Sequence, residues 1–341
     1  MARTRRVDPS GPGIRRVKRG TGFSYHEEDG DKISDRATLE RIRALAIPPA
    51  WTDVWICPHP RGHVQATGTD DAGRRQYRYH DDWRVSRDQL KFEEMEQFAK
   101  VLPTMRERLR EDLKLRGLAY ERVCACSVWL LDCGLFRIGS ERYENDNASY
   151  GLTTIKRKHV KIERGVATFD YPAKSGKRSK HEINDPSVMP TLKALKQRKG
   201  GAKLKDFLVY RDGREWKDLV ADDVNAFIKE ISGEGFSAKD FRTWNATVVA
   251  AMTVAQTDPD AEAPSKAARK RVVRTAIEKT ALLLNNTPAV CKASYIDPRV
   301  FDRYEAGETV APQLQRLDRA AGEDGFADRD RIEAAVLRLL S

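Results

Sequence analysis

The hydrophobic periodicity of the chain changes near residue 87, and this change restricts the fold to two dissimilar parts. Before it come short β-type runs bounded by Gly, Pro and Asp, which are GFSYH, VWICPH, HVQATG and RQYRYH. Among them, residues 34–45 have the spacing of one helix. After it, FEEMEQFAKVLPTMRERLREDL and AYERVCACSVWLLDCGLF have helical periodicity. We therefore predict an α+β protein, with a β-rich domain at 21–88 and a larger, mainly α-helical domain at 89–341.

One segment of the helical part, residues 158–184, returns to strand-like alternation. Gly165 and Gly176 mark two turns within it. This pattern predicts a small three-stranded β meander inside the helical domain. Further helices are predicted near 187–197, 221–231, 240–255, 265–285 and 328–340.

The charge of the chain favours a polyanionic partner. Lys and Arg number 62 against 51 Asp and Glu, which gives a formal net charge of +11. Such cations gain affinity by releasing counterions from phosphates. Residues 1–20 hold seven of them and one acid in a stretch that contains Gly and Pro. We interpret this stretch as a flexible basic arm that could touch phosphates; a merely solvated terminus is the alternative.

Several classes of function leave signatures that this sequence lacks. It has no GxxxxGK(S/T) nucleotide loop, no HExxH motif and no Asp-rich cation loop, and its six His do not cluster with Cys or carboxylates. We expect chemistry that requires no metal, nucleotide or other cofactor. No apolar run opens the chain or reaches the roughly 18 residues of a membrane span. We expect a cytoplasmic protein with no membrane partner.

The five Cys offer no disulfide framework, because their number is odd and their spacing irregular. Cys124, Cys126 and Cys133 lie in an apolar helical stretch with no fourth ligand near in sequence. We interpret them as core residues rather than a zinc site.

The candidate chemical residues are three cations and one tyrosine. Arg137 stands in GLFRIGSERY, Lys174 in FDYPAKSGK, Arg242 in KDFRTWNAT and Tyr295 in NNTPAVCKASYIDPR. Taken singly, each has an ordinary structural reading, because a cation at a helix end or hairpin tip is usually solvated. A Tyr followed by Ile in a segment with Ala and Val more often belongs to a core.

Together and in this order, the four motifs resemble those of type IB DNA topoisomerases, in particular the small bacterial and poxvirus-like branch. The catalytic fold of that family is shared with tyrosine recombinases. Lys239, three residues before Arg242, belongs to the second arginine motif. The resemblance extends to the N-terminal part, where IPPAWTDVWICP and GHVQATGTDDAGRRQYRYH are similar to the DNA-clamp domain of the family. It covers about residues 21–305.

The resemblance implies a role for each residue. Tyr295 would attack a backbone phosphorus and form a 3′-phosphotyrosyl link. Arg137 and Arg242 would bind the nonbridging oxygens of the transition state, with Lys239 beside them. Lys174 would protonate the leaving 5′-oxygen. Because the phosphotyrosyl link conserves the energy of the phosphodiester, resealing would need no ATP, and supercoiled DNA would relax while the strand is open.

The chain departs from the family pattern nine residues before the tyrosine. Many members carry a His there, in His-Thr-Pro, and this chain has Asn286 in Asn286-Thr287-Pro288. An Asn side chain can donate a hydrogen bond to a phosphate oxygen but cannot carry positive charge. We expect an active enzyme with a weaker contribution at this position.

The resemblance also implies contacts with duplex DNA, the expected partner. Gln76, Tyr77 and Tyr79 match DNA-contacting positions of the N-terminal domain, and Tyr143 matches another. Gln can pair with adenine edges in the major groove. Tyr77 and Tyr79 share one face of a strand, so both either contact DNA or pack the sheet. We expect a monomer that clamps DNA and associates with the nucleoid.

Two alternatives remain open. A tyrosine recombinase would use the same nucleophile, but such enzymes usually have His at the position of Lys239 and a helical N-terminal domain. A DNA-binding clamp without catalysis is the second alternative, and Asn286 is its only support.

Overall fold

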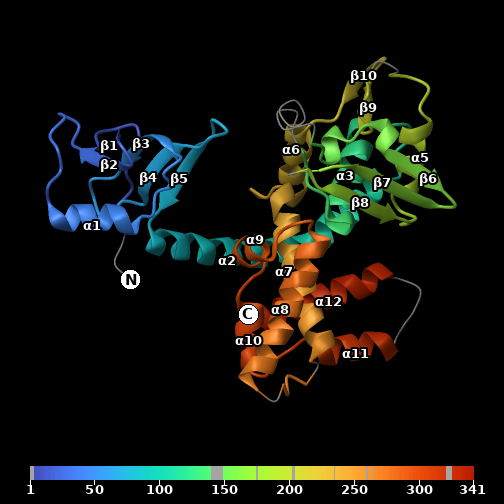
Figure 1. The fold of residues 1–341 in the computed structure, drawn as a ribbon. Helices are drawn as coiled ribbons and strands as arrows, with labels where there is room; N and C mark the ends of the chain where they lie inside the picture. The colour runs from blue at the N-terminus through green and yellow to red at the C-terminus, as the bar shows by residue number, and fades with distance from the viewer. Residues whose placement is uncertain are drawn as a thin grey trace. The chain divides into compact units, whose positions relative to one another are not determined.

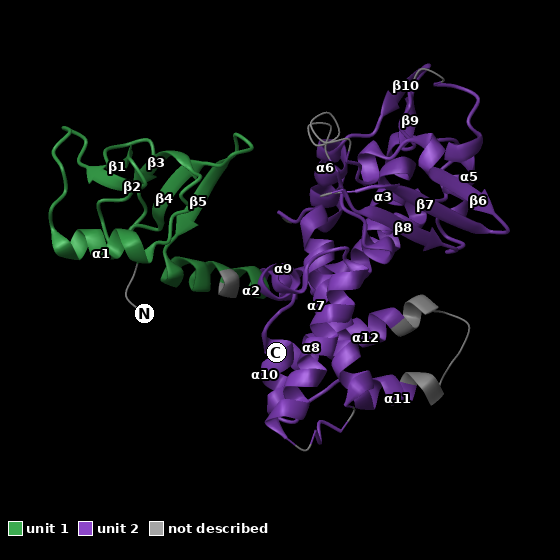
Figure 2. Ribbon diagram, viewed as in Figure 1, with its two compact units in different colours: residues 1–93 green, residues 94–341 purple. Residues whose placement is uncertain are grey.

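The computed structural model describes residues 4–139, 149–173, 176–201, 204–233, 235–258, 260–263, 265–319 and 325–341. The chain divides into two compact units, Met1–Glu93 and Glu94–Ser341 (Figure 2). Unit 1 is built on an antiparallel sheet and unit 2 is mainly helical with small sheets (Figure 1). This confirms the predicted α+β class.

The sheet of unit 1 has five strands in the order β2-β1-β3-β4-β5. Their bounds are β1 Ile14–Arg19, β2 Gly22–His26, β3 Thr52–Ile56, β4 Val64–Thr69 and β5 Arg75–Tyr79. Helix α1, Arg36–Ala44, begins after Asp35, whose carboxylate accepts a hydrogen bond from the Thr38 amide at 2.8 Å. Ile42 of α1 packs on Ile14, Val54 and Ile56 of the sheet to form the core of the unit.

Strand β1 places residues 14–19 of the predicted flexible arm, 1–20, within the sheet. It pairs with β2 along its length and with β3 at Ile14 and Arg15. The guanidinium of Arg16 donates to the carbonyls of Pro48 and Trp51 and lies 4.2 Å from the centre of the Phe23 ring. Backbone pairing on both sides therefore holds this strand, although the charge, Gly and Pro of residues 1–20 suggested mobility.

In unit 2, helix α3, Tyr120–Gly134, is buried along most of its length. Its sequence is apolar on nearly every face, which is typical of a helix surrounded by other elements. It packs against α5, α6, α7, β8 and β9. Cys124 and Cys126 are fully buried within it, as predicted for core residues, and Cys133 is partly buried.

The predicted meander is present as a three-stranded antiparallel sheet in the order β6-β7-β8. Its strands are β6 Val160–Glu163, β7 Val166–Pro172 and β8 Arg178–Ile183. A second hairpin, β9 Val209–Asp212 and β10 Glu215–Asp218, was not predicted.

The helices that follow the five-stranded sheet lie near the predicted positions, and within the described residues three further short helices occur late in the chain. Their bounds are α2 Asp81–Asp112, α5 Met189–Gln197, α6 Ala221–Ser232, α7 Ala238–Thr257, α8 Lys266–Leu283, α9 Pro288–Ser294, α10 Arg299–Glu305, α11 Ala311–Arg319 and α12 Gly325–Leu340. Short 3-10 turns lie at Leu152–Thr154 and Arg157–His159. Helix α7 packs against α3, α6, α8, α10, α11 and α12, so it forms the centre of the unit.

A buried charge cluster fastens the C-terminal helix α12 to this centre. Arg106 of α2 is fully buried and binds Asp132 of α3 at 2.8 Å, Glu333 of α12 at 2.9 Å, and Asp330. Arg329 of α12 binds the same Asp132 at 2.7 Å and Glu333 at 2.8 Å. Each buried carboxylate thus has two cationic partners, as the low dielectric of a core requires.

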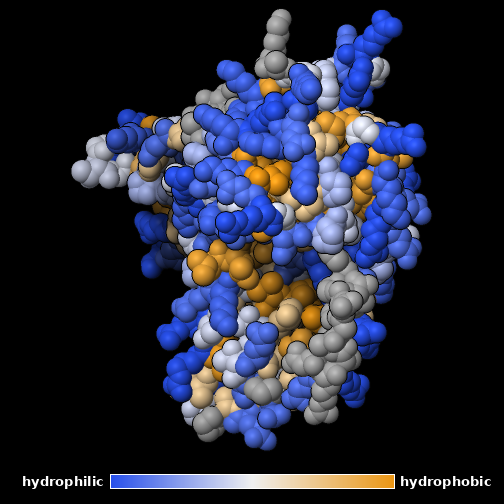
Figure 3. Space-filling view, turned by 90° about the vertical axis from the view of Figure 1, so that its right-hand side faces the viewer, coloured by the Kyte–Doolittle hydropathy of each residue, from blue (hydrophilic) through white to orange (hydrophobic). Residues whose placement is uncertain are grey.

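The surface is mostly hydrophilic on the face drawn in Figure 3, with hydrophobic side chains exposed in patches between the polar ones. Within the described ranges, no helix combines the length and the apolar character needed to cross a membrane.

Candidate active site

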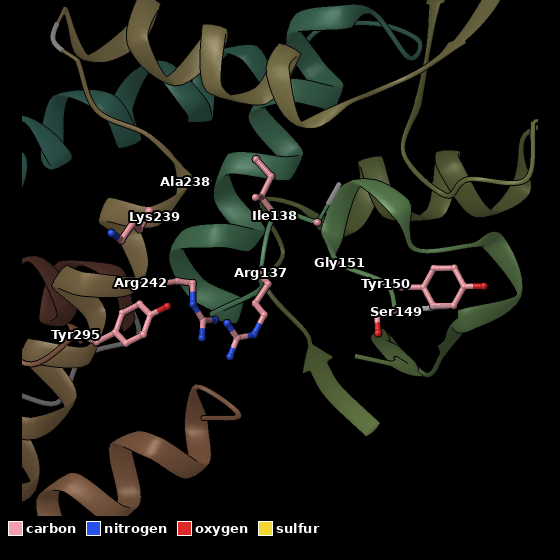
Figure 4. A pocket seen from close by; sticks show the side chains of 10 residues that line it. Arg137, Ile138, Ser149, Tyr150, Gly151, Ala238, Lys239, Arg242 and Tyr295 are labelled. Carbon is pink, nitrogen blue, oxygen red and sulfur yellow. The ribbon is translucent and has the colours of Figure 1, made fainter. Parts of the chain in front are cut away.

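A pocket of about 260 Å³ in unit 2 brings together four of the predicted site residues, which are Arg137, Lys239, Arg242 and Tyr295 (Figure 4). They come from the loop after α3, from the first turns of α7 and from the residue that ends α9. The other lining residues are Ile138, Gly139, Ser149, Tyr150, Gly151 and Ala238.

Arg242 is buried against the ends of two helices. Its two terminal guanidinium nitrogens donate to the main-chain carbonyls of Leu135, after α3, and Leu284, after α8, the latter at 2.8 Å. Its Nε is buried without a hydrogen-bond partner in the described part of the chain. Burial, together with the neighbouring Arg137 charge, lowers the pKa of Arg242 to about 10, so it remains cationic at neutral pH.

Arg137 is held by main-chain contacts around it. Its guanidinium donates to the carbonyl of Asn285 at 3.1 Å, and its own carbonyl accepts from the Leu152 amide at 2.7 Å. Beside it, Gly139 and Gly151 approach so closely that a Cβ on Gly151 would lie 2.4 Å from the Gly139 Cα. Only glycine fits there, so the loop that carries Arg137 has little freedom to shift.

Tyr295 faces this pair of cations. The guanidinium carbon of Arg242 lies 5.6 Å from the centre of the Tyr295 ring, and the hydroxyl points toward the space beside the two guanidinium groups (Figure 4). Burial raises the pKa of the phenol, but the charges and hydrogen bonds of Arg242 and Arg137 outweigh it, so the pKa of Tyr295 is lowered. The site therefore makes the phenol easier to deprotonate than a free tyrosine, and the phenolate is the form that acts as a nucleophile.

Lys239 lines the pocket, and Asn286 belongs to the segment whose carbonyls hold the two arginines. Lys239 is exposed and lies on the wall of the pocket, one turn before Arg242. Asn286 directly follows Leu284 and Asn285, whose carbonyls bind the arginines. Its main-chain N–H donates to the Ala281 carbonyl at 2.8 Å. The side-chain Nδ2 of Asn286 is buried and has no acceptor among the described residues. A buried amide N–H without an acceptor costs free energy, and a hydrogen bond to an oxygen of a ligand would remove that cost.

Five further residues were predicted to act in catalysis or to contact DNA. Lys174 and Tyr143 lie outside the described residues. Gln76, Tyr77 and Tyr79 belong to β5 of unit 1. The two tyrosines are 50% and 40% exposed with their rings stacked 6.0 Å apart, so they do not pack into the core of unit 1.

Sequence reasoning missed two residues that shape the site. Gly151 was not singled out, and Thr247 was quoted only as the end of KDFRTWNAT. Thr247 is 2% exposed, and its hydroxyl contacts the main chain of the Tyr295 segment. A hydroxyl residue on the apolar side of a buried helix was the available signal for Thr247.

Comparison with known proteins gives matches over both units. A family model described as "Eukaryotic DNA topoisomerase I, catalytic core" matches residues 80–323, and one described as "Bacterial DNA topoisomerase IB, N-terminal domain" matches residues 22–70. The chain is 32% identical to DNA topoisomerase 1B of Acanthamoeba polyphaga mimivirus, over 86% of this chain and 88% of that protein. It is 24% identical to DNA topoisomerase 1 of Drosophila melanogaster, over 74% of this chain but 26% of the fly protein.

Proposed function

The chain belongs to the type IB DNA topoisomerase family, and from this premise we propose that it relaxes supercoiled duplex DNA by cutting and resealing one strand through Tyr295. The observation that carries the proposal is the approach of the Tyr295 phenol to Arg242 and Arg137 in one pocket. The Tyr295 phenol is the proposed nucleophile, and its pKa is lowered. Arg242 and Arg137 are cations held in place by main-chain carbonyls.

The proposed cleavage is a transesterification. The Tyr295 oxygen bonds to the phosphorus, the bond from phosphorus to the 5′-oxygen breaks, and a 3′-phosphotyrosyl link remains. Negative charge gathers on the nonbridging oxygens in the transition state, and Arg137 and Arg242 stabilise it. Because the bonds of Arg242 to two carbonyls orient its guanidinium before DNA arrives, little reorganisation is needed during the reaction.

Protons must leave the phenol and reach the 5′-oxygen. The two guanidinium charges make the phenol easier to deprotonate. We assign protonation of the leaving 5′-oxygen to Lys174, on the family motif alone. The Nδ2 of Asn286 supplies a neutral donor to a nonbridging oxygen, because it is buried near the arginines and has no acceptor in the described structure. Lys239 adds a cation at the pocket wall.

The proposed reaction requires no ATP and no metal ion. The phosphotyrosyl link keeps the energy of the phosphodiester, so attack by the 5′-hydroxyl reverses the first step. Charge stabilisation comes from the arginines, which serve the purpose that a metal ion serves in other phosphoryl-transfer sites.

We further propose that unit 1 contacts the duplex through β5. Tyr77 and Tyr79 present a stacked, exposed pair, and the Gln76 amide is oriented by a 2.9 Å hydrogen bond to Asp70. Aromatic faces and an amide are suited to sugar, phosphate and base-edge contacts. The protein is proposed to act as a monomer that encloses DNA.

Relaxation of a supercoiled plasmid in EDTA without ATP tests the proposal, with Tyr295→Phe as the matched control. We expect relaxation by the wild type and none by Tyr295→Phe, which lacks only the nucleophilic oxygen. Detergent quenching should trap a covalent protein–DNA adduct with the wild type alone. Binding without relaxation or adduct would favour a non-catalytic clamp, and strand exchange between two sites in trans would favour a recombinase.

A further inference from the structure

Thr247 links the helix that carries Arg242 to the segment that carries Tyr295. It lies in α7, five residues after Arg242, and is almost fully buried. Its hydroxyl oxygen accepts a hydrogen bond from the Asp297 amide at 3.0 Å. The same hydroxyl lies 3.1 Å from the Thr243 carbonyl and 3.4 Å from the Tyr295 carbonyl, the two acceptors for its proton.

The segment around Tyr295 is weakly supported on its N-terminal side. Helix α9 has seven residues, of which Cys291 alone is buried. Tyr295 itself ends the helix with φ −129° and ψ −34°, outside regular helical geometry. The firm support comes after it, where Ile296 and Asp297 are each 1% exposed. The hydroxyl of Thr247 binds the main chain at that point.

Helix α7 consequently positions both Arg242 and the main chain of Tyr295. Arg242 extends from it to the pocket, and Thr247 fixes the main chain of the tyrosine about 7.5 Å further along the helix axis. The 5.6 Å separation between the guanidinium and the Tyr295 ring therefore depends on the contact that this helix makes with the tyrosine segment through Thr247.

We propose that Thr247 is a positioning residue that sets where the Tyr295 phenol stands relative to Arg242 and to the scissile phosphate. The proposal rests on the function proposed above for Tyr295. Thr247 touches no DNA; it acts through the Tyr295 and Asp297 main chain. Displacing a nucleophile by about 1 Å costs on the order of 10²-fold in rate.

Thr247→Val tests this role, since Val has nearly the same shape but no hydroxyl. We expect adduct formation in a single turnover, at saturating protein, to slow by about 10–100-fold with unchanged DNA affinity. Thr247→Ser keeps the hydroxyl and should recover most of the rate. Thr253→Val is the matched control, because Thr253 lies buried on the same helix and its hydroxyl bonds to the Val249 carbonyl of its own helix.

The pH dependence separates positioning from general loss of structure. If Tyr295 moves away from Arg242, its pKa rises, so the pH profile of adduct formation should shift upward in Thr247→Val and not in Thr253→Val. Equal effects of the two Val variants, an unaltered Thr247→Val, or failure of Ser to restore the rate would each overturn the proposal.

A second measurement does not depend on catalysis. Ultraviolet titration of the DNA-free protein, with Tyr295→Phe subtracted, reports the pKa of this phenol. It should be higher in Thr247→Val than in the wild type. If the wild type forms no adduct, the function proposed for Tyr295 fails, while the titration still decides whether Thr247 positions the phenol.

Discussion

Replacing Arg106 by Met removes a buried charge and keeps an unbranched side chain of similar reach. In the native cluster, Arg106 and Arg329 face the carboxylates of Asp132, Asp330 and Glu333. Two cations and three carboxylates give this cluster a net charge of −1. Without Arg106 the net charge becomes −2, and the two carboxylates that are least accessible to water, Asp132 and Glu333, share one cation.

The expected loss of stability is large. Breaking a buried ion pair by removing one partner costs about 3–5 kcal/mol, because the remaining charge stays buried without compensation. For a unit of the size of unit 2, each kcal/mol shifts Tm by about 2–4 °C, so Arg106→Met should melt about 6–20 °C below the wild type. Since α12 is held through the same cluster, its docking should weaken as well.

Urea unfolding followed by far-ultraviolet circular dichroism measures this loss. Arg274→Met is the control, since Arg274 forms an exposed pair with Glu278 in α8 at 3.8 Å and such pairs contribute about 0.3–0.5 kcal/mol. If Arg106→Met unfolds within about 1 kcal/mol of the wild type, the cluster tolerates an unpaired carboxylate and the reasoning is wrong.

The cost of Arg106→Met should also depend on pH. Burial raises the pKa of Asp132, but the charges of Arg329 and Arg106 lower it further than burial raises it, so the net shift is downward. A lowered native pKa stabilises the fold above the unfolded value, and that stability is lost as pH falls through the native value. Without Arg106 the excess carboxylate can take up a proton, so the difference between variant and wild type should shrink in acid. A difference that grows in acid would contradict this account.

Three further outcomes are expected. Asn286→Ala should slow adduct formation by about 10²–10³-fold if its buried donor binds a nonbridging oxygen; an unchanged single-turnover rate would remove Asn286 from the site. Arg242→Lys should lose activity nearly as completely as Arg242→Ala in plasmid relaxation, because the single ammonium nitrogen cannot replace the two separate guanidinium nitrogens that reach the Leu135 and Leu284 carbonyls. Retention of more than about a tenth of the rate would argue against this, since tenfold corresponds to only about 1.4 kcal/mol. Burial lowers the pKa of His181 to about 4. Between about pH 6.5 and 4 the unfolded chain therefore binds a proton that the native state does not bind, so the free energy of unfolding should decrease as the pH falls through this window. His181→Phe should flatten the fall in urea unfolding, and an equal slope in both proteins would assign it to other groups.

The sequence predicted elements whose pattern is local. Alternation interrupted by Gly165 and Gly176 is enough to define the β6–β8 meander, and the helical spacing of residues 34–45 is enough to define α1. Strand β1 was missed because it is held by backbone bonds to strands on both sides, which its charged side chains do not reveal. The β9–β10 hairpin had a usable signal in Asp212-Gly213, where Gly213 has φ 59°.

The site was predictable in a different way. Arg137, Arg242 and Tyr295 are far apart in sequence, and no periodicity brings them together; their resemblance to known motifs does. Their environment could not be predicted. That the Arg242 guanidinium bridges the ends of α3 and α8, or that Gly139 meets Gly151, depends on the packing of segments distant in the chain.

The placement of Lys239, Arg242 and Thr247 on helix α7 limits how the lengths of related chains can differ. Each helical residue turns the chain by about 100°, so one insertion or deletion between Arg242 and Thr247 would leave the cation in the pocket and rotate the hydroxyl away from the tyrosine segment. No neighbouring residue could repair both contacts at once. Length differences among homologues should therefore be absent from this stretch of α7 and should gather in connections such as the one between β9 and β10.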